Sequence, residues 1–253
     1  MKSVFLSSAF ALATAVPTVA QPVLPDGTAR TIVLVHGAFA DETGWADVAA
    51  LLQAKGYVVT AVSNPLTGLA DDIAATQAVL DAQDGPTVLV GHSYGGVVIG
   101  ETGDHENVAA IVYVAAFAPD VGESLGALSQ SGPPTEGVQQ IVPDDKGFLS
   151  INVGAFPAVF AADLPAEEAE ALANGQRPLN GAIFAEAIET AAWHDKPVWY
   201  VIATQDKVID PGAQHFFAER MGAQITKIEA SHAVYISQPE AVAAVIEAAA
   251  AGQ

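Results

Sequence analysis

The sequence predicts an α/β fold, in which a mostly parallel central sheet carries helices on both faces and a lid is inserted between two strands. Two observations predict it. Short apolar runs, typical of strands buried on both faces, alternate with segments of helical periodicity. Residues 118–196, which we call the insertion, interrupt this alternation with proline- and glycine-rich turns. We interpret the insertion as a lid over a ligand site; an ordinary surface excursion is the alternative.

Strands are expected where apolar runs fill a short segment, at residues 31–37, 57–65, 87–93, 108–117, 197–206 and 224–231. Helices are expected where apolar positions recur at helical spacing, at residues 44–56, 69–85, 211–223 and 239–251, and from about residue 94. Gly56 ends the first helix, Pro65 stops the second strand, and Pro211 fits a first helical turn. Within the insertion, residues 164–175 and 181–193 also have a helix-like pattern.

The first twenty residues have the pattern of a secretory signal. Lys2 supplies the positive charge, residues 4–16 form the apolar stretch, and residues 18–20 offer a cleavage site with small side chains. This pattern predicts an exported protein, periplasmic or secreted, with one domain over residues 21–253. An uncleaved N-terminal helix is the alternative.

Composition excludes several classes of function. The formal net charge of −20 on 253 residues disfavours binding to nucleic acid or anionic lipid. No segment after the signal is long enough to span a membrane. The absence of cysteine excludes disulfides, thiolate metal sites and a cysteine nucleophile. The acidic pairs at 144–145 and 167–168 have no histidine at ligand spacing, so we expect neither a metal nor another cofactor.

One serine stands between a predicted strand and a predicted helix, in TVLVGHSYGGVVIG (residues 87–100). Gly91, Ser93 and Gly95 match the G-x-S-x-G pattern of a nucleophile elbow, where glycines let the backbone turn tightly beneath the hydroxyl. The N-terminus of the next helix directs N–H groups toward a developing anion. This context favours Ser93 as a nucleophile that needs a base and an acid partner.

The base and the acid are sought at the carboxyl ends of the other strands, because these ends share one edge of a parallel sheet. Of six histidines, His232 directly follows the last predicted strand and is our candidate base; a capping or core histidine is the alternative. Asp206 and Asp210 both follow the apolar run that begins at residue 197. Asp210 precedes Pro211 and suits a helix N-cap, which favours Asp206 as the acid.

The resulting order, serine then acid then histidine, is that of the α/β-hydrolases, and the chain resembles this superfamily over nearly all of residues 21–253. The segments HGAFADETGW, NPLTGLADD, GHSYGG, VAAFAPD and ATQDKVIDP resemble its small-esterase branch, which includes salicylate-ester, hydroxynitrile-lyase and pyrethroid-esterase proteins. The resemblance implies an oxyanion hole made by the N–H groups of Ala38 and Tyr94, with Phe39 as the alternative to Ala38. Hydroxynitrile lyases of this type carry lysine at the position of Ala233, which argues against cyanohydrin cleavage.

These observations predict a serine hydrolase that cleaves small to medium carboxylic esters through an acyl-enzyme. The insertion holds twelve acidic and three basic residues, which favours neutral or cationic esters as the small-molecule partner. A non-catalytic binding protein on the same fold, or a lyase, perhydrolase or carbon–carbon hydrolase with the same triad, is the alternative. The oligomeric state is left open.

Six aromatic side chains are candidates for the wall of an apolar substrate pocket, with simple core or lid packing as the alternative for each. They are Phe39, Trp45, Phe117, Phe156, Phe160 and Trp193.

Overall fold

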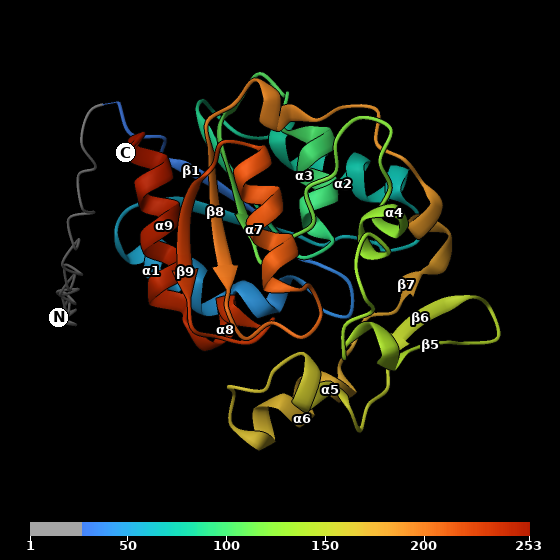
Figure 1. Cartoon of the computed structure of the whole chain (residues 1–253). Coiled ribbons are helices and arrows are strands. Elements are labelled where there is room, and N and C mark those ends of the chain that lie inside the picture. The colour runs from blue at the N-terminus through green and yellow to red at the C-terminus, as the bar shows by residue number, and fades with distance from the viewer. Residues whose placement is uncertain (1–26) are drawn as a thin grey trace, which may run out of the picture.

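The structure, a computed structural model, describes residues 27–253 and contains the predicted parallel sheet (Figure 1). Within these residues the central sheet has six strands in the order β2-β1-β3-β4-β8-β9, and every neighbouring pair is parallel. The strands are β1 (Thr31–Val35), β2 (Val58–Val62), β3 (Thr87–His92), β4 (Val108–Val114), β8 (Val198–Ala203) and β9 (Gln224–Ile228). The predicted signal segment, residues 1–20, lies outside the described residues.

Helices cover both faces of the sheet because alternate strand side chains point to opposite faces. Ile32 and Leu34 of β1 belong to a core cluster with helices α1 (Ala46–Ala54) and α9 (Pro239–Ala251). Val33 and Val35 belong to a second cluster with α2 (Leu69–Asp81), α3 (Gly95–Thr102) and α7 (Pro211–Arg220). The apolar runs are therefore buried on both faces, which confirms the predicted fold class.

The insertion has an architecture of its own between β4 and β8. It contains an antiparallel sheet of β5 (Ile141–Pro143), β6 (Phe148–Ile151) and β7 (Leu179–Asn180), which the sequence did not predict. Three short helices, α4 (Leu125–Ser129), α5 (Phe156–Val159) and α6 (Ala166–Asn174), accompany it. In Figure 1, α5 and α6 lie beyond the end of the sheet toward which the β8 arrow points.

The predicted helix over residues 181–193 is wrong. Two short 3₁₀ turns, Gly181–Ala185 and Ala192–His194, take its place. Between them the backbone pairs with a distant segment: Ile188 donates its N–H to the carbonyl of Glu123 at 3.0 Å and accepts from Gly122 at 2.9 Å. These bonds occupy main-chain groups that a helix would use internally, so tertiary pairing overrides the helical periodicity of this stretch.

Several predicted strands also end too late, because the chain leaves the sheet at the edge where the site is built. The apolar runs predicted to extend to residues 65, 117, 206 and 231 leave strand conformation after Val62, Val114, Ala203 and Ile228. A short helix, α8 (Val234–Ser237), follows at this edge and was not predicted.

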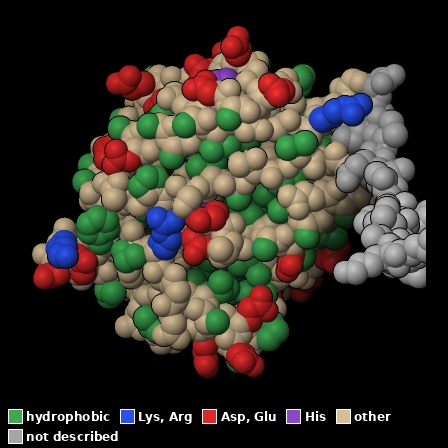
Figure 2. Space-filling view, turned by 180° about the vertical axis from the view of Figure 1, so that it is seen from behind, with side chains coloured by type: hydrophobic (Ala, Val, Ile, Leu, Met, Phe, Trp, Pro, Cys, Tyr) green, Lys and Arg blue, Asp and Glu red, His purple; other side chains and the backbone are tan. Residues whose placement is uncertain are grey.

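Acidic side chains are spread over the face of the molecule shown in Figure 2, where Lys and Arg are few. This agrees with the net charge of −20. Among residues 27–253, no helix combines the length and the apolar character needed to cross a bilayer.

Candidate active site

Ser93 occupies a sharp turn between β3 and α3. Its φ of 54° lies in the left-handed region, which is strained for a residue with a side chain. Glycines around it make room for the turn. A Cβ at Gly91 would lie 2.6 Å from the carbonyl oxygen of Gly95, and one at Gly96 would lie 2.1 Å from that of Phe117. Gly91 and Gly96 of the motif GHSYGG are therefore required sterically, and the turn holds the serine side chain at the carboxyl edge of the sheet.

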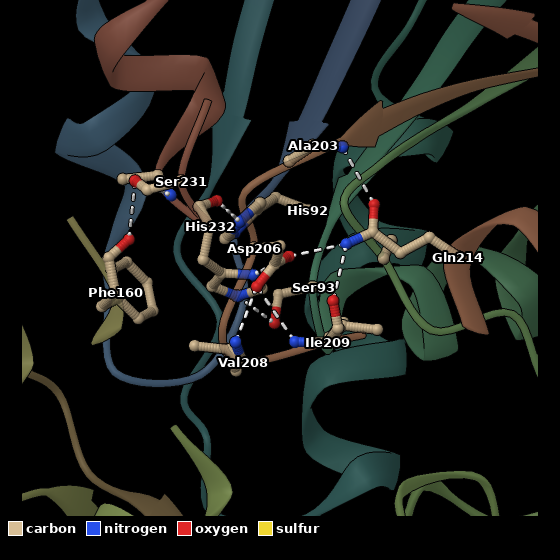
Figure 3. A network of polar contacts seen from close by, with 12 residues as sticks. His92, Ser93, Phe160, Ala203, Asp206, Val208, Ile209, Gln214, Ser231 and His232 are labelled. Atoms are coloured by element: carbon tan, nitrogen blue, oxygen red, sulfur yellow. Dashed lines mark hydrogen bonds and ion pairs between the residues drawn. The ribbon is translucent and has the colours of Figure 1, made fainter. Parts of the chain in front are cut away.

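A continuous hydrogen-bonded chain links Ser93, His232 and Asp206 (Figure 3). The Nε2 atom of His232 lies 2.9 Å from Ser93 Oγ, and its Nδ1 atom lies 2.7 Å from Asp206 Oδ2. A carboxylate accepts and cannot donate, so Nδ1–H donates to Asp206 and Nε2 accepts the serine hydroxyl. This is the tautomer in which an imidazole can remove the serine proton. The three residues are 5%, 0% and 5% exposed in the order Ser93, His232, Asp206.

Asp206 is held by donors on both oxygens. Its Oδ1 atom accepts the backbone N–H groups of Val208 at 2.7 Å and Ile209 at 3.0 Å. Its Oδ2 atom accepts from His232 and from the side-chain amide of Gln214, each at 2.7 Å. Four donors face the carboxyl group, which matches the hydrogen-bonding capacity of an ionised carboxylate.

Asp210, the other candidate acid, is used elsewhere. Its Oδ1 atom accepts the N–H groups of Gly212 at 2.8 Å and Ala213 at 3.1 Å, so it caps α7. This is the N-cap role expected of an acid immediately before Pro211.

The N–H groups of Ala38 and Tyr94 have no acceptor within residues 27–253, and the same holds for those of the adjacent Gly37 and Gly95. The N–H of Phe39, the alternative to Ala38, donates instead to the carbonyl of Arg177 at 3.2 Å. The Tyr94 hydroxyl donates to Asp72 at 2.7 Å, which anchors the residue directly after Ser93. Burial raises the pKa of Asp72, and the hydrogen bonds that it accepts oppose this rise.

His92 is a functional-site neighbour that the sequence did not identify. Its Nε2 lies 2.9 Å from the carbonyl oxygen of His232 and must donate, because a carbonyl only accepts. Its ring centroid is 4.6 Å from that of His232 and 4.4 Å from that of Tyr235. Burial lowers the pKa of His92 well below its usual value, and the charge of a protonated His232 would lower it further. His92 therefore remains neutral and fixes the backbone of His232.

The buried histidine predicts acid-sensitive folding. Because the pKa of His92 is lower in the folded than in the unfolded chain, the unfolded chain binds more protons below its own value of about 6.5. Above that pH, protonation of His92 does not change the free energy of unfolding. Below it, protonation of the unfolded chain lowers the free energy of unfolding by up to ~1.4 kcal/mol per pH unit. Urea midpoints measured at about pH 7.5 and 5.5 should show a smaller loss for His92→Gln than for the unchanged protein. Equal losses in both proteins contradict this assignment.

Of the six candidate pocket aromatics, Phe160 and Phe117 contact triad residues, Phe156 contacts Phe160, and Phe39 lines a separate groove. Phe160 meets the His232 ring edge-on, with centroids 4.8 Å apart, and stacks on Phe156 at 4.5 Å. Phe117 lines a cavity of about 620 Å³, and Phe39 lines a smaller groove of about 250 Å³ beside α6. Phe117 also donates its N–H to the carbonyl of Ser93 at 3.1 Å.

The other two candidate pocket aromatics, Trp45 and Trp193, pack against residues outside the triad. Trp45 is fully buried against Tyr235, with ring centroids 4.5 Å apart, in the core cluster beneath α1 and α9. Trp193 donates its Nε1–H to the carbonyl of Pro119 at 2.9 Å and stacks on His194. The structure does not bring either tryptophan to the triad, and both placements are those of packing residues.

Ser93, His232 and Asp206 do not themselves line the 620 Å³ cavity, but three residues that are hydrogen-bonded to Ser93 or Asp206 do. Val208 and Ile209, which donate to Asp206, line one side, and Phe117 lines another. Leu128, of the insertion, contributes a further apolar wall. A space of this size and polarity suits an apolar small molecule. Within residues 27–253, no three His, Asp or Glu side chains gather in a way that could hold a metal ion.

Comparison with known proteins places this geometry in a family. The chain is 30% identical over 238 residues to a probable hydrolase, R7, of Phoma sp., covering 85% of this chain and 96% of that protein. It is 26% identical over 238 residues to a carbendazim hydrolyzing esterase of Nocardioides sp., covering 83% and 96%. The crystal structure of a pyrethroid hydrolase from Sphingobium faniae JZ-2 superposes with a TM-score of 0.76 at 25% identity, covering 87% of this chain and 97% of that one. Residues 32–245 match the model of the alpha/beta hydrolase family, so the chain belongs to that family and has esterase-like relatives.

Proposed function

We propose that this protein is a serine hydrolase of carboxylic esters. The observation that carries the proposal is the unbroken hydrogen-bonded chain from Ser93 Oγ through His232 to Asp206, in the tautomer that permits proton removal. Relatives named as a carbendazim hydrolyzing esterase and a pyrethroid hydrolase support the same reaction class.

The mechanism follows from the geometry. His232 Nε2 takes the proton of Ser93 as Oγ attacks the ester carbonyl carbon. The N–H groups of Ala38 and Tyr94 stabilise the oxyanion, a contribution of ~3–4 kcal/mol for each donor. The tetrahedral intermediate then breaks its carbon–oxygen bond to the alcohol, which leaves with the proton from His232. Water, deprotonated by the same histidine, releases the acid and restores Ser93.

The surroundings favour apolar, uncharged esters of modest size. The neighbouring cavity of about 620 Å³ is lined largely by apolar side chains. The insertion carries twelve acidic residues against three basic ones, which repels carboxylate-bearing substrates.

We interpret the insertion as a lid over this site. Its residue Phe160 packs against the His232 ring and accepts, through its carbonyl, the N–H of Ala233 at 2.9 Å and the hydroxyl of Ser231 at 3.1 Å. These contacts anchor the insertion to the loop that carries the histidine, and they exclude water from the triad.

A fluorophosphonate probe and a series of p-nitrophenyl esters test the proposal. The probe should label Ser93, because only an activated serine displaces its fluoride. The rate constant kcat/KM should rise with acyl chain length until the cavity is filled, by about tenfold for every two buried methylenes. A protein that binds esters but resists the probe would instead be a non-catalytic binding protein. A preference for carboxylate-bearing esters would contradict the proposed substrate class.

A further inference from the structure

Among the described residues, two side chains donate to the carboxylate of Asp206, those of His232 and Gln214. Gln214 lies on the first turns of α7, is fully buried, and points inward toward the end of β8 (Figure 3). Its amide nitrogen lies 2.7 Å from Asp206 Oδ2 and 2.9 Å from the carbonyl oxygen of Ile209. Its amide oxygen accepts the N–H of Ala203 at 3.1 Å.

The orientation of this amide is determined by its partners. The two groups near the nitrogen, a carboxylate and a carbonyl, can only accept, and the group near the oxygen is an N–H that can only donate. A flipped amide would place its oxygen against two acceptors. Both N–H bonds of Gln214 are therefore used, and one of them always points at Asp206.

The oxygen that Gln214 contacts is the one that holds the histidine. Oδ2 of Asp206 accepts from Gln214 and from His232 at the same distance of 2.7 Å, whereas Oδ1 accepts two backbone N–H groups. The amide N–H places the positive end of a dipole beside Oδ2 and draws charge away from the bond to His232. Gln214 thus influences both the direction and the strength of the Asp206–His232 hydrogen bond.

We propose that Gln214 is a positioning residue of the reaction, acting on the histidine through Asp206. The inference rests on the proposed function, since it assigns a role within the same triad. Gln214 has no exposed surface, so it acts on turnover and leaves substrate binding unchanged. The ionisable side chains near His232 are Asp206 on the β8–α7 loop, His92 on β3 and, one residue beyond β1, His36 beside His92.

The substitution Gln214→Met tests this role, because methionine fills similar space and cannot donate to Asp206. Loss of the donor leaves more charge on Oδ2, which stabilises the imidazolium of His232. The acid limb of the kcat/KM–pH profile on a p-nitrophenyl ester should move to higher pH by roughly half a unit. The value of kcat should fall by about tenfold while KM stays constant.

Gln205, on the β8–α7 loop, serves as a matched control. Gln205 is exposed and donates its amide to Glu229 at 2.9 Å, away from the triad. Gln205→Met should therefore leave the pH profile and kcat unchanged. Folded Gln214→Met could instead show an unchanged acid limb and an unchanged kcat, with only a lower melting temperature. That result would overturn the proposal, because Gln214 would then have a purely structural role.

Proton NMR gives a second test that requires neither ester turnover nor a folded variant. In the unchanged protein, the downfield Nδ1 proton of His232 and one side-chain amide proton of Gln214 share one acceptor atom, Oδ2 of Asp206. Their resonances should therefore shift together as the pH is changed. A Gln214 signal that stays constant while the His232 signal titrates overturns the proposal. Joint titration in a protein that turns over no ester would support Gln214 and reject the esterase function, so the two failures are distinguishable.

Discussion

Replacing Ser93 by alanine is expected to remove ester hydrolysis while leaving the fold intact. The substitution deletes only Oγ, which His232 contacts at 2.9 Å, and keeps the Cβ that the strained turn already accommodates. Without the nucleophile no acyl-enzyme forms, and kcat should fall on the order of 10⁵- to 10⁶-fold. Residual turnover would come from the oxyanion hole and from binding alone. Steady-state kinetics on a p-nitrophenyl ester measures the loss.

The control for this experiment is a serine outside the site. Ser63, exposed one residue after β2, accepts from Arg177 at 3.3 Å, and Ser63→Ala should retain full turnover. Circular dichroism and the melting temperature of Ser93→Ala should match those of the unchanged protein, since one lost hydrogen bond changes stability by only ~1 kcal/mol. Substantial turnover by folded Ser93→Ala would end the proposal of a serine esterase.

Replacing Gly96 by alanine is expected to have the largest effect on stability. A Cβ at this position would lie 2.1 Å from the carbonyl oxygen of Phe117 and 2.9 Å from the side chain of Ala116. The backbone of Phe117 has little freedom to retreat, because its N–H donates to the carbonyl of Ser93 at 3.1 Å. The elbow and the strand end must separate, at a cost of more than ~4 kcal/mol.

Gly100, on the same helix, is the matched control. Its added Cβ would meet the hydroxyl of Tyr113 at 3.7 Å, an ordinary contact. Gly100→Ala should therefore be neutral or stabilising by up to ~1 kcal/mol through helix propensity. Urea unfolding of both variants gives the comparison. Equal stability of Gly96→Ala and the unchanged protein would show that the elbow and β4 are packed less tightly than the structure indicates.

Local sequence patterns were sufficient to predict the main helices and strands of the fold. The helix over 239–251 was predicted with the boundaries that α9 has, because its apolar spacing and Pro239 are local signals. Strands such as β1 and β3 were recognisable from apolar runs, since burial on both faces leaves no polar position. The same reasoning placed Ser93, Asp206 and His232 at one edge, because parallel strands end together.

Features that depend on residues distant in the sequence could not be predicted from local patterns. The stretch 181–193 has helical periodicity, yet its pairing with residues 122–124 prevents a helix. In the sequence Gln214 is one of several polar residues of a predicted helix, and nothing in its neighbours shows that its amide faces a carboxylate. His92 is indistinguishable in sequence from any histidine of a G-x-S-x-G motif.

The sequence by itself determined the layered α/β framework, and it predicted the turn at Ser93 and the preference for Asp206 over Asp210 as the acid, because periodicity, turn chemistry and helix capping act over a few residues. Tertiary structure decided which side chains meet across 139 residues, from Ser93 to His232, and which buried polar groups hold them. The physical reason is that a buried hydrogen bond forms only where tertiary packing brings donor and acceptor to within about 3 Å of each other. The residue types alone do not specify which groups meet.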